Sequence, residues 1–301
     1  MTVMSWVGHS SDMTQPHAQP RTHPSAEWSD LAERTEAIAM RRLVDDETPA
    51  VTEQLGLSSH DAGDGVHTVV VRDPMWGYWN KALGFCETLS EATVGEVLER
   101  GRVRGVAALG LLVQPRVVPT DWEAIVTEHA LTRGTLFVKL FGPAEPRTVD
   151  TDLRISRLEP EHAGDFVRIM AAGFGFEATP DAFAMFDGGQ YFAGDWATYG
   201  AWDGETLLAV ARMLCVPETS SVALFGAATL PEGRNRGAQT ALLDARIREA
   251  RDRGLRFASA ETFAETAQNP NPSLHNMRRV GLIDVHARPS WVWHHPALGN
   301  G

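Results

Sequence analysis

A glycine-bearing loop at residues 231–237 has the residue types of a phosphate or pyrophosphate site. An apolar, strand-like run at residues 221–230 precedes it, and residues 237–253 repeat small and apolar residues at helical spacing. The first turn of such a helix leaves backbone N–H groups without intrahelical partners, and the helix dipole favours an anion there. Gly237 would let the backbone approach the ligand closely, and Arg234 and Arg236 would add charge-assisted hydrogen bonds. By itself, the loop is equally compatible with an ordinary turn that carries surface arginines.

The loop and its surroundings resemble the acyl-CoA signature of the GNAT superfamily of N-acyltransferases. The family's pattern, Gln/Arg-x-x-Gly-x-Gly/Ala, is occupied here by Arg234, Gly237 and Gln239. Residues 273–282 resemble the family's short helix beneath the pantetheine arm, which a glycine and two closing strands follow. The combination is more specific than the loop alone, and the resemblance extends over residues 151–296.

The resemblance implies that acetyl-CoA is the donor and that no metal ion takes part. In the family, the backbone of the strand before the loop pairs with the pantetheine amides, and one of its N–H groups stabilises the oxyanion. The residues that would contact the donor lie in the strand end, the loop, the first turn of the helix and the short helix: Ala227, Ala228, Thr229, Leu230, Arg234, Asn235, Arg236, Gly237, Ala238, Gln239, Thr240 and Asn276.

Two positions depart from the family's pattern. Gln239 stands where the second glycine or alanine is expected, so either the loop is more open there or the glutamine amide contacts phosphate. Met277 stands where many relatives have a tyrosine that protonates the departing thiolate, and methionine cannot donate a proton. Ser273 or water is the candidate proton donor in its place.

The general base is also missing from its usual place. The strand at residues 221–230 has no carboxylate, although some relatives keep a glutamate there. Glu261, expected near the carboxyl end of the next strand, is our candidate base, acting through water. The alternative is a surface or salt-bridged glutamate. His275 and His286 could titrate near neutral pH, but a packed or exposed histidine is the better explanation of each.

A loop near residue 190 contains glycines, aromatic residues and two acids. Asp187, Tyr191 and Asp195 could line the acceptor side of the site, and the loop could act as a mobile lid. An ordinary long loop is the alternative.

The elements that must position these residues form an α+β domain with a mixed, mostly antiparallel sheet flanked by helices. The hydrophobic periodicity predicts helices that begin at residue 159 and at residues 237–253 and 273–280. Asp203 and Gly204 predict a hairpin turn. The expected strands are residues 153–158, 197–202, 206–216, 221–230, 256–262, 284–286 and 290–293.

The first half of the chain resembles a degenerate copy of the same architecture, as in tandem GNAT proteins. It has no phosphate loop, so we expect it to wall the acceptor pocket rather than bind a second donor. The expected units are a disordered tail (1–26), a degenerate GNAT-like domain (27–146) and an acyl-CoA-binding GNAT domain (151–301). In the first half, the periodicity predicts helices at 28–44, 91–100 and 121–129, a loop or broken helix at 46–65, and strands at 67–72, 78–85, 106–113 and 135–141.

Composition limits the function classes. The net charge of −12 over 301 residues argues against non-specific nucleic-acid binding, although residues 231–290 hold ten arginines against seven acids. No apolar run approaches the 18 or so residues that span a membrane. Cys86 and Cys215 each lie in an apolar setting typical of buried free thiols, which fits a reducing, cytoplasmic location.

The sequence therefore predicts an acetyl-CoA-dependent N-acyltransferase, acting on the amine of a small molecule by direct attack in a ternary complex. Two alternatives stay open: a GNAT-like transferase with aminoacyl-tRNA as donor, and a non-catalytic acyl-CoA-binding module. The oligomeric state is left as monomer or homodimer.

Overall fold

The computed structural model describes residues 25–186 and 188–298. The expected disordered tail therefore falls outside the described residues, except that Ser25 and Ala26 begin the first helix. Asp187 lies outside them as well. Within the described ranges, no helix is long and apolar enough to cross a membrane.

The described part of the first half contains two helices, a run of three strands, and then a helix, a strand, a helix and a long final strand. Ser25 caps the first helix by accepting a hydrogen bond from the Trp28 N–H. The helices are α1 (Ala26–Asp45), α2 (Pro49–Leu55), α3 (Glu91–Arg104) and α4 (Trp122–Glu128), with short 3-10 turns η1 (Pro74–Trp79) and η2 (Pro115–Val117). The strands are β1 (Leu57–Asp61), β2 (His67–Val71), β3 (Lys81–Leu83), β4 (Ala108–Leu112) and β5 (Thr132–Pro143).

The second half repeats this order, with one additional strand at its start. Its strands are β6 (Arg154–Arg157), β7 (Trp196–Asp203), β8 (Thr206–Val216), β9 (Ser221–Thr229), β10 (Phe257–Phe263) and β11 (Ile283–His294). Its helices are α5 (Ala163–Phe174), α6 (Pro180–Phe186), α7 (Ala238–Asp252) and α8 (Pro272–Arg279), with 3-10 turns η3 (Pro160–His162), η4 (Gly189–Phe192), η5 (Pro217–Thr219) and η6 (Pro231–Gly233).

The two halves share one sheet because they exchange their last strands. The strand order is β1-β2-β3-β4-β11-β5-β10-β9-β8-β7-β6. The last strand of the second half, β11, thus lies between β4 and β5 of the first half, and β5 lies between β10 and β11. Each half keeps one parallel strand–helix–strand unit: β3–α3–β4 in the first and β9–α7–β10 in the second.

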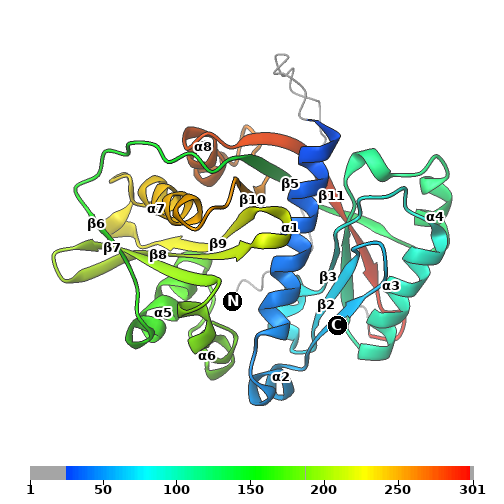
Figure 1. Cartoon of the computed structure of the whole chain (residues 1–301). Helices are drawn as coiled ribbons and strands as arrows, with labels where there is room; N and C mark the ends of the chain where they lie inside the picture. Colours follow the sequence, from blue (N-terminus) through cyan, green and yellow to red (C-terminus); the bar gives the residue numbers. More distant parts are fainter. Residues whose placement is uncertain (1–24, 187, 299–301) are drawn as a thin grey trace.

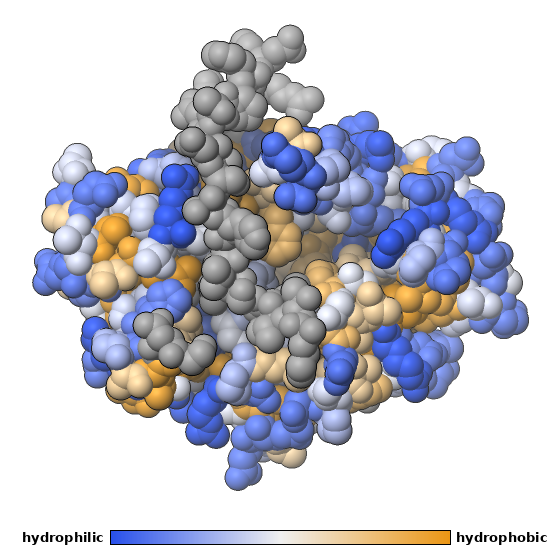
Figure 2. Space-filling view, turned by 180° about the vertical axis from the view of Figure 1, so that it is seen from behind, coloured by the Kyte–Doolittle hydropathy of each residue, from blue (hydrophilic) through white to orange (hydrophobic). Residues whose placement is uncertain are grey.

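The three largest hydrophobic clusters of the described residues hold most of the helices to the sheet. A central core packs α1, α2, α5 and α6 together from both halves. The helices α7 and α8 cover the other face of β9 and β10, and α3 and α4 cover β4. Figure 1 shows α1 running across the middle of the molecule, between α5 and α6 on one side and the strands β2 and β3 on the other. On the opposite face, hydrophilic residues gather along the outer edges, and hydrophobic residues show in a hollowed area near the middle (Figure 2).

Most of the predicted elements are present, and the differences have local causes. The segment expected as a loop or broken helix after α1 contains α2 and β1, and α6 was not expected. The strand expected at 78–85 starts late, because η1 begins at Pro74 and Asp73 accepts a hydrogen bond from the Met75 N–H. The two expected final strands are one strand, β11, whose alternation is interrupted by irregularities at Asp284/His286 and Pro289/Trp291. The hairpin predicted at Asp203 and Gly204 joins β7 to β8.

Candidate functional site

The strands β9 and β10 separate at the end that faces the loop of residues 231–237. Their parallel pairing covers only the first part of each strand and ends at Leu224 and Ala260. Beyond that point β10 continues to pair with β5, while β9 continues to pair with β8. The edge of β9 from Phe225 onward is therefore open toward β10, and an extended ligand could pair with it as an additional strand.

A β-bulge turns β9 away from β10 at this point. Arg212 pairs with Phe225 and Val210 pairs with Ala228, so one residue of β8 faces two of β9. Gly226, in the bulge, has a φ of +56°, which glycine adopts without strain. A ligand carbonyl beside the bulge could accept a hydrogen bond from a backbone N–H of β9 that is not paired with β10.

Arg246 of α7 supports the bulge from behind. Its guanidinium is 1% exposed and donates hydrogen bonds to the carbonyl oxygens of Arg212 (2.8 Å) and Phe225 (3.4 Å). Burial lowers its pKa to about 9, and no carboxylate pairs with it among the described residues. Nothing in the helical pattern of residues 237–253 distinguishes this buried arginine from its exposed neighbours.

The amino terminus of α7 follows the bulge and carries unpaired backbone donors. Gly237 is its N-cap residue, with a φ of +76°, and no side chain caps the helix. Asn235, two residues earlier, also has a positive φ of 60°. When left-handed residues stand just before the start of a helix, the successive backbone N–H groups point to the same side. Such a group of N–H donors can bind an anion. Gly237 is also required sterically, because a Cβ atom there would lie 2.7 Å from the carbonyl oxygen of Asp150.

A cavity of about 680 Å³ joins the open edge of β9 to this helix terminus. It extends to the end of α5 at Gly173 and Phe174 and to the start of α8 at Pro272, none of which the loop pattern indicated. Ten of the twelve residues expected to contact the donor line it, as does Ser273: Ala227, Ala228, Thr229, Arg234, Asn235, Gly237, Ala238, Gln239, Thr240 and Asn276.

The two other expected donor contacts, Leu230 and Arg236, do not line this cavity. Leu230 uses its N–H in a hydrogen bond to the carbonyl oxygen of Leu208 and borders a groove with β6 and α5 instead. The Arg236 guanidinium forms salt bridges with Asp152 (2.5 Å) and Asp203 (2.7 Å). These carboxylates raise the pKa of Arg236 and tie the loop to the segment between the halves. In this structure its side chain is therefore a structural tie, and the phosphate contact expected from it stays a prediction.

Gln239 connects α7 to α8 across the floor of the cavity. Its amide nitrogen donates to the Ser273 hydroxyl oxygen (2.6 Å), and its amide oxygen accepts from the Asn276 amide (2.7 Å). Neither sequence expectation for Gln239, a more open loop or a phosphate contact, describes this bridge. Because Ser273 accepts a hydrogen bond from Gln239, its own hydroxyl proton is available for another acceptor.

Glu261 is the first residue of β10 beyond its pairing with β9, and it is held by two cations. Arg288 of β11 donates to its carboxylate (2.6 Å), and Lys139 of β5 lies 3.2 Å away. Burial opposes ionisation, but Lys139, Arg288 and Lys81 outweigh it and lower the pKa of Glu261 to about 2. This geometry is the salt-bridged alternative considered from the sequence, and a base with so low a pKa is weak at neutral pH.

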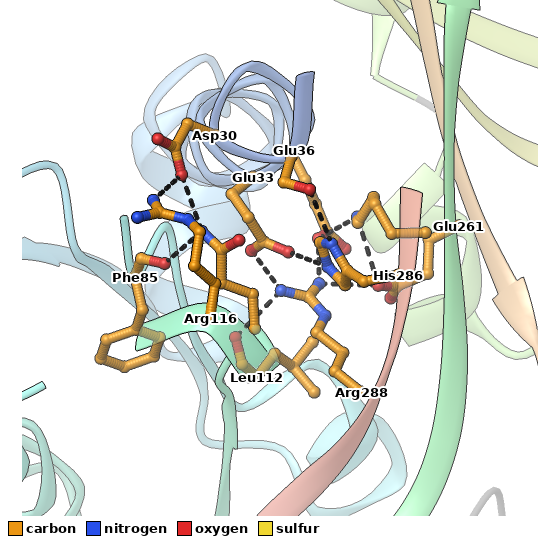
Figure 3. Close-up of polar contacts among 12 residues, drawn as sticks. Asp30, Glu33, Glu36, Phe85, Leu112, Arg116, Glu261, His286 and Arg288 are labelled. Atoms are coloured by element: carbon orange, nitrogen blue, oxygen red, sulfur yellow. Dashed lines mark hydrogen bonds and ion pairs between the residues drawn. The ribbon is translucent and has the colours of Figure 1, made fainter. Parts of the chain in front are cut away.

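The same cations serve two acids of α1, which forms a charge network between the halves. Arg288 is fully buried and also contacts Glu33, Glu36 and the carbonyl oxygen of Leu112 (2.9 Å). The His286 Nε2–H donates to the Glu33 carboxylate (2.8 Å), so His286 is a packed histidine of this network (Figure 3). His275, in contrast, is half exposed beside Glu265 at the rim of the cavity between β9 and α7.

The expected acceptor loop is packed against the first half of the chain. Tyr191 is 1% exposed, and its hydroxyl donates to Glu47, which follows α1. Asp195 forms a salt bridge with Arg42 of α1 (3.3 Å). Tyr191 and Asp195 therefore join the halves, and they hold η4 in place beside α1.

The equivalent separation of strands in the first half is filled. The β3–β4 pairing ends at Ala82 and Leu111. Beyond it, the Gln114 amide donates to the carbonyl oxygen of Phe85 (2.9 Å), and Arg116 donates to that of Cys86 (2.8 Å). Asp30 of α1 accepts from both side chains (Figure 3). The helix that follows, α3, is capped by Ser90, whose hydroxyl accepts from the Thr93 N–H.

Two further expectations concern cysteines and metals. Cys86 and Cys215 are free and buried, as predicted. Among residues 25–186 and 188–298, no group of three or more His, Cys, Asp or Glu side chains could hold a metal ion.

Comparison with known proteins shows similarity in structure only. No family model and no curated protein matches the chain. It is similar to the solved structure of a GCN5-related N-acetyltransferase from Kribbella flavida, with a TM-score of 0.58 and 13% identity, over 88% of this chain and 95% of that one. A GCN5-related N-acetyltransferase from Sphaerobacter thermophilus has a TM-score of 0.56 and 12% identity, over 93% and 95%.

A third similar structure is a tandem GNAT protein from the clavulanic acid biosynthesis pathway. Its TM-score is 0.53 at 11% identity, and the similarity covers 93% of this chain and 98% of that one. Identities this low establish the fold alone. The chain has the GNAT fold, in a mixed, mostly antiparallel sheet flanked by helices and built from two GNAT-like halves, which confirms the fold predicted from the sequence.

Proposed function

We propose that this chain is an N-acyltransferase that moves an acetyl or other short acyl group from acyl-CoA to the amine of a small molecule. One observation carries the proposal: the open edge of β9 and the uncapped amino terminus of α7 border the same cavity. A pantetheine arm needs an unpaired strand edge, and a pyrophosphate needs unpaired N–H donors. Two of the similar structures are named N-acetyltransferases, which agrees with this assignment.

In the proposed reaction, the amine nitrogen attacks the thioester carbon and the carbon–sulfur bond breaks. A backbone N–H at the bulge of β9 would stabilise the oxyanion. The thiolate would take a proton from Ser273 or water, and Ser273 is suited to this because it accepts its hydrogen bond from Gln239. The chain's main contribution is to hold both substrates in one geometry.

Glu261 can remove the amine proton only if its carboxylate first separates from one of its two cations. The carboxylate is 10% exposed and shared between Lys139 and Arg288, so it would have to leave one cation before it could accept a proton. An acceptor that arrives as a free amine, or that loses its proton to bulk solvent, does not need Glu261 as a base. The substitution Glu261→Gln, described below, distinguishes these two routes.

The two halves are proposed as units of residues 27–146 and 151–301. The repeated order of elements and the two parallel strand–helix–strand units support the division. The halves are not separate in space, because β5 and β11 each pair with strands of the other half. The first half would wall the acceptor side through α1, since Glu47 and Arg42 contact the loop near residue 190.

Calorimetric titration with acetyl-CoA tests the proposal, together with mass spectrometry of ligands that co-purify with the protein. We expect one acetyl-CoA per chain and acetylation of a primary amine in the presence of the chain. Binding of acetyl-CoA without transfer to a panel of amines would favour a non-catalytic acyl-CoA-binding module. Absence of binding, with a tRNA bound instead, would favour the aminoacyl-tRNA alternative.

A further inference from the structure

A second cavity continues from the candidate donor cavity around the first turn of α7. It has a volume of about 570 Å³ and shares Gly237, Thr240 and Arg279 with the donor cavity. Its outer wall is the segment that joins the two halves, through Arg147 to Asp150. A ligand whose diphosphate lies at the start of α7 would therefore extend directly into this second space.

Two arginines from different parts of the chain border this second cavity. The Arg147 guanidinium packs against Gly281 at the end of α8, so closely that a Cβ atom on Gly281 would lie 2.7 Å from its Nη2. Arg279 of α8 is fixed by a hydrogen bond from its Nη1 to the Asn276 amide oxygen (2.6 Å). Neither arginine forms a salt bridge with any carboxylate in the described part of the chain, whereas Arg236, nearby, forms two.

Two guanidinium groups that border the same cavity and have no carboxylate partner among the described residues favour the binding of an anion there. A phosphate monoester offers several oxygens and a charge near −2, which the fork of an arginine side chain matches. The Asp150 side chain belongs to the same segment and disfavours an anion, so the arginines must outweigh one carboxylate.

We propose that Arg147 and Arg279 bind the 3′-phosphate of the CoA ribose and make this chain selective for CoA over 3′-dephospho-CoA. The inference rests on the proposed function, because only a donor seated at α7 places its ribose in this cavity. It also gives the segment between the halves a role in donor recognition, through Arg147.

The test compares the affinities of CoA and 3′-dephospho-CoA by calorimetry. Wild-type protein should bind CoA about tenfold more tightly, since two exposed charge-assisted contacts are each modest. The double variant Arg147→Ala/Arg279→Ala should bind the two ligands equally, with little change for 3′-dephospho-CoA. The ratio in the wild type should shrink at high salt, because exposed charges are screened.

Arg251→Ala is the matched control, since Arg251 is an exposed arginine of α7 outside both cavities. It should leave the tenfold ratio intact. Equal binding of CoA and 3′-dephospho-CoA by the wild type would overturn the inference and leave the proposed function standing. Binding of neither ligand would overturn both. A double variant that keeps the wild-type ratio would also overturn the inference, because the 3′-phosphate would then be recognised elsewhere.

Discussion

The two halves of the molecule contain the same parallel strand–helix–strand unit, but only one leaves room for a ligand. In the second half, β9 and β10 separate beside a helix that begins at Gly237 with no side-chain cap. In the first half, Gln114 and Arg116 occupy the equivalent gap, and Ser90 caps the helix. The same topology can thus hold a ligand or exclude it, and a few polar side chains decide which.

The strand position just beyond the pairing shows a second difference. The second half has Glu261 there, within the charge network, and the first half has the apolar Leu112. The open gap is therefore supported by ion pairs from β5 and β11, the exchanged strands, while the closed gap is supported by hydrogen bonds to its own carbonyl groups.

The largest effect is expected from Glu261→Gln. The substitution leaves Lys139 and Arg288 short of a buried partner, so the free energy of unfolding should fall by about 3–5 kcal/mol. Glu265→Gln is the control, because Glu265 pairs with His275 and Arg278 at the surface and should lose less than about 1 kcal/mol. Urea unfolding measures both, and an unchanged stability in Glu261→Gln would contradict the structural role.

The same variant tests the proton-transfer hypothesis when it is assayed below its unfolding temperature. If Glu261 is the base, kcat with an alkyl amine should fall by about 10²–10⁴, with a loss that shrinks as pH rises. If its role is structural alone, the kcat–pH profile of the folded variant should run parallel to that of the wild type. Acetyl-CoA affinity should be retained in both cases.

Matched threonines in the two helices test where the donor binds. Thr240 and Thr93 are both the third residue after the N-cap, of α7 and α3 respectively. A glutamate in a first helical turn favours folding in either place, and after Ser90 it completes a capping box. Thr240→Glu should nevertheless weaken acetyl-CoA binding more than about 100-fold, because its charge opposes the pyrophosphate. Thr93→Glu should leave the affinity unchanged, and an equal loss in both variants would refute the assignment.

A pair of glutamines separates stability from binding. Gln114→Ala leaves the buried carbonyl oxygen of Phe85 unpaired, so the free energy of unfolding should fall by about 1–3 kcal/mol with no change in acetyl-CoA affinity. Gln239→Ala removes the bridge between α7 and α8 and should weaken acetyl-CoA binding about fivefold. Both variants are measured by calorimetry and by urea unfolding. Weaker acetyl-CoA binding in Gln114→Ala, with unchanged binding in Gln239→Ala, would contradict the assignment of the site to the second half.

The last effect is a pH dependence that the open gap should show. Because Lys139, Arg288 and Lys81 lower the folded-state pKa of Glu261 to about 2 against burial, its stabilising contribution is present above the unfolded value of 4.5. It should be lost as pH falls from 4.5 toward 2, since the unfolded chain then binds more protons. Urea midpoints across this range should fall less steeply in Glu261→Gln, and identical slopes would contradict the assignment.

Local pattern predicted much of the fold and most of the proposed donor contacts. Helical periodicity located α1 and α7 closely, and apolar runs bounded by turn residues located β8 and β9, which are largely buried on both faces. The pattern was weakest where local chemistry overrides periodicity, as at η1 after Asp73 and at the irregularities in β11. It also could not tell that Arg236 is paired to Asp152 and Asp203, because those partners come from other segments.

The sequence by itself determined the loop at Gly237, the strand before it and the helix after it, because these residues are neighbours along the chain. Only the tertiary structure decided that β5 and β11 change places between the halves, and with them the partners of Glu261. Lys139 and Arg288 are more than a hundred residues apart, and no local pattern records which strand lies beside which. The surroundings of a buried charge depend on that choice, and so do its pKa and its chemistry.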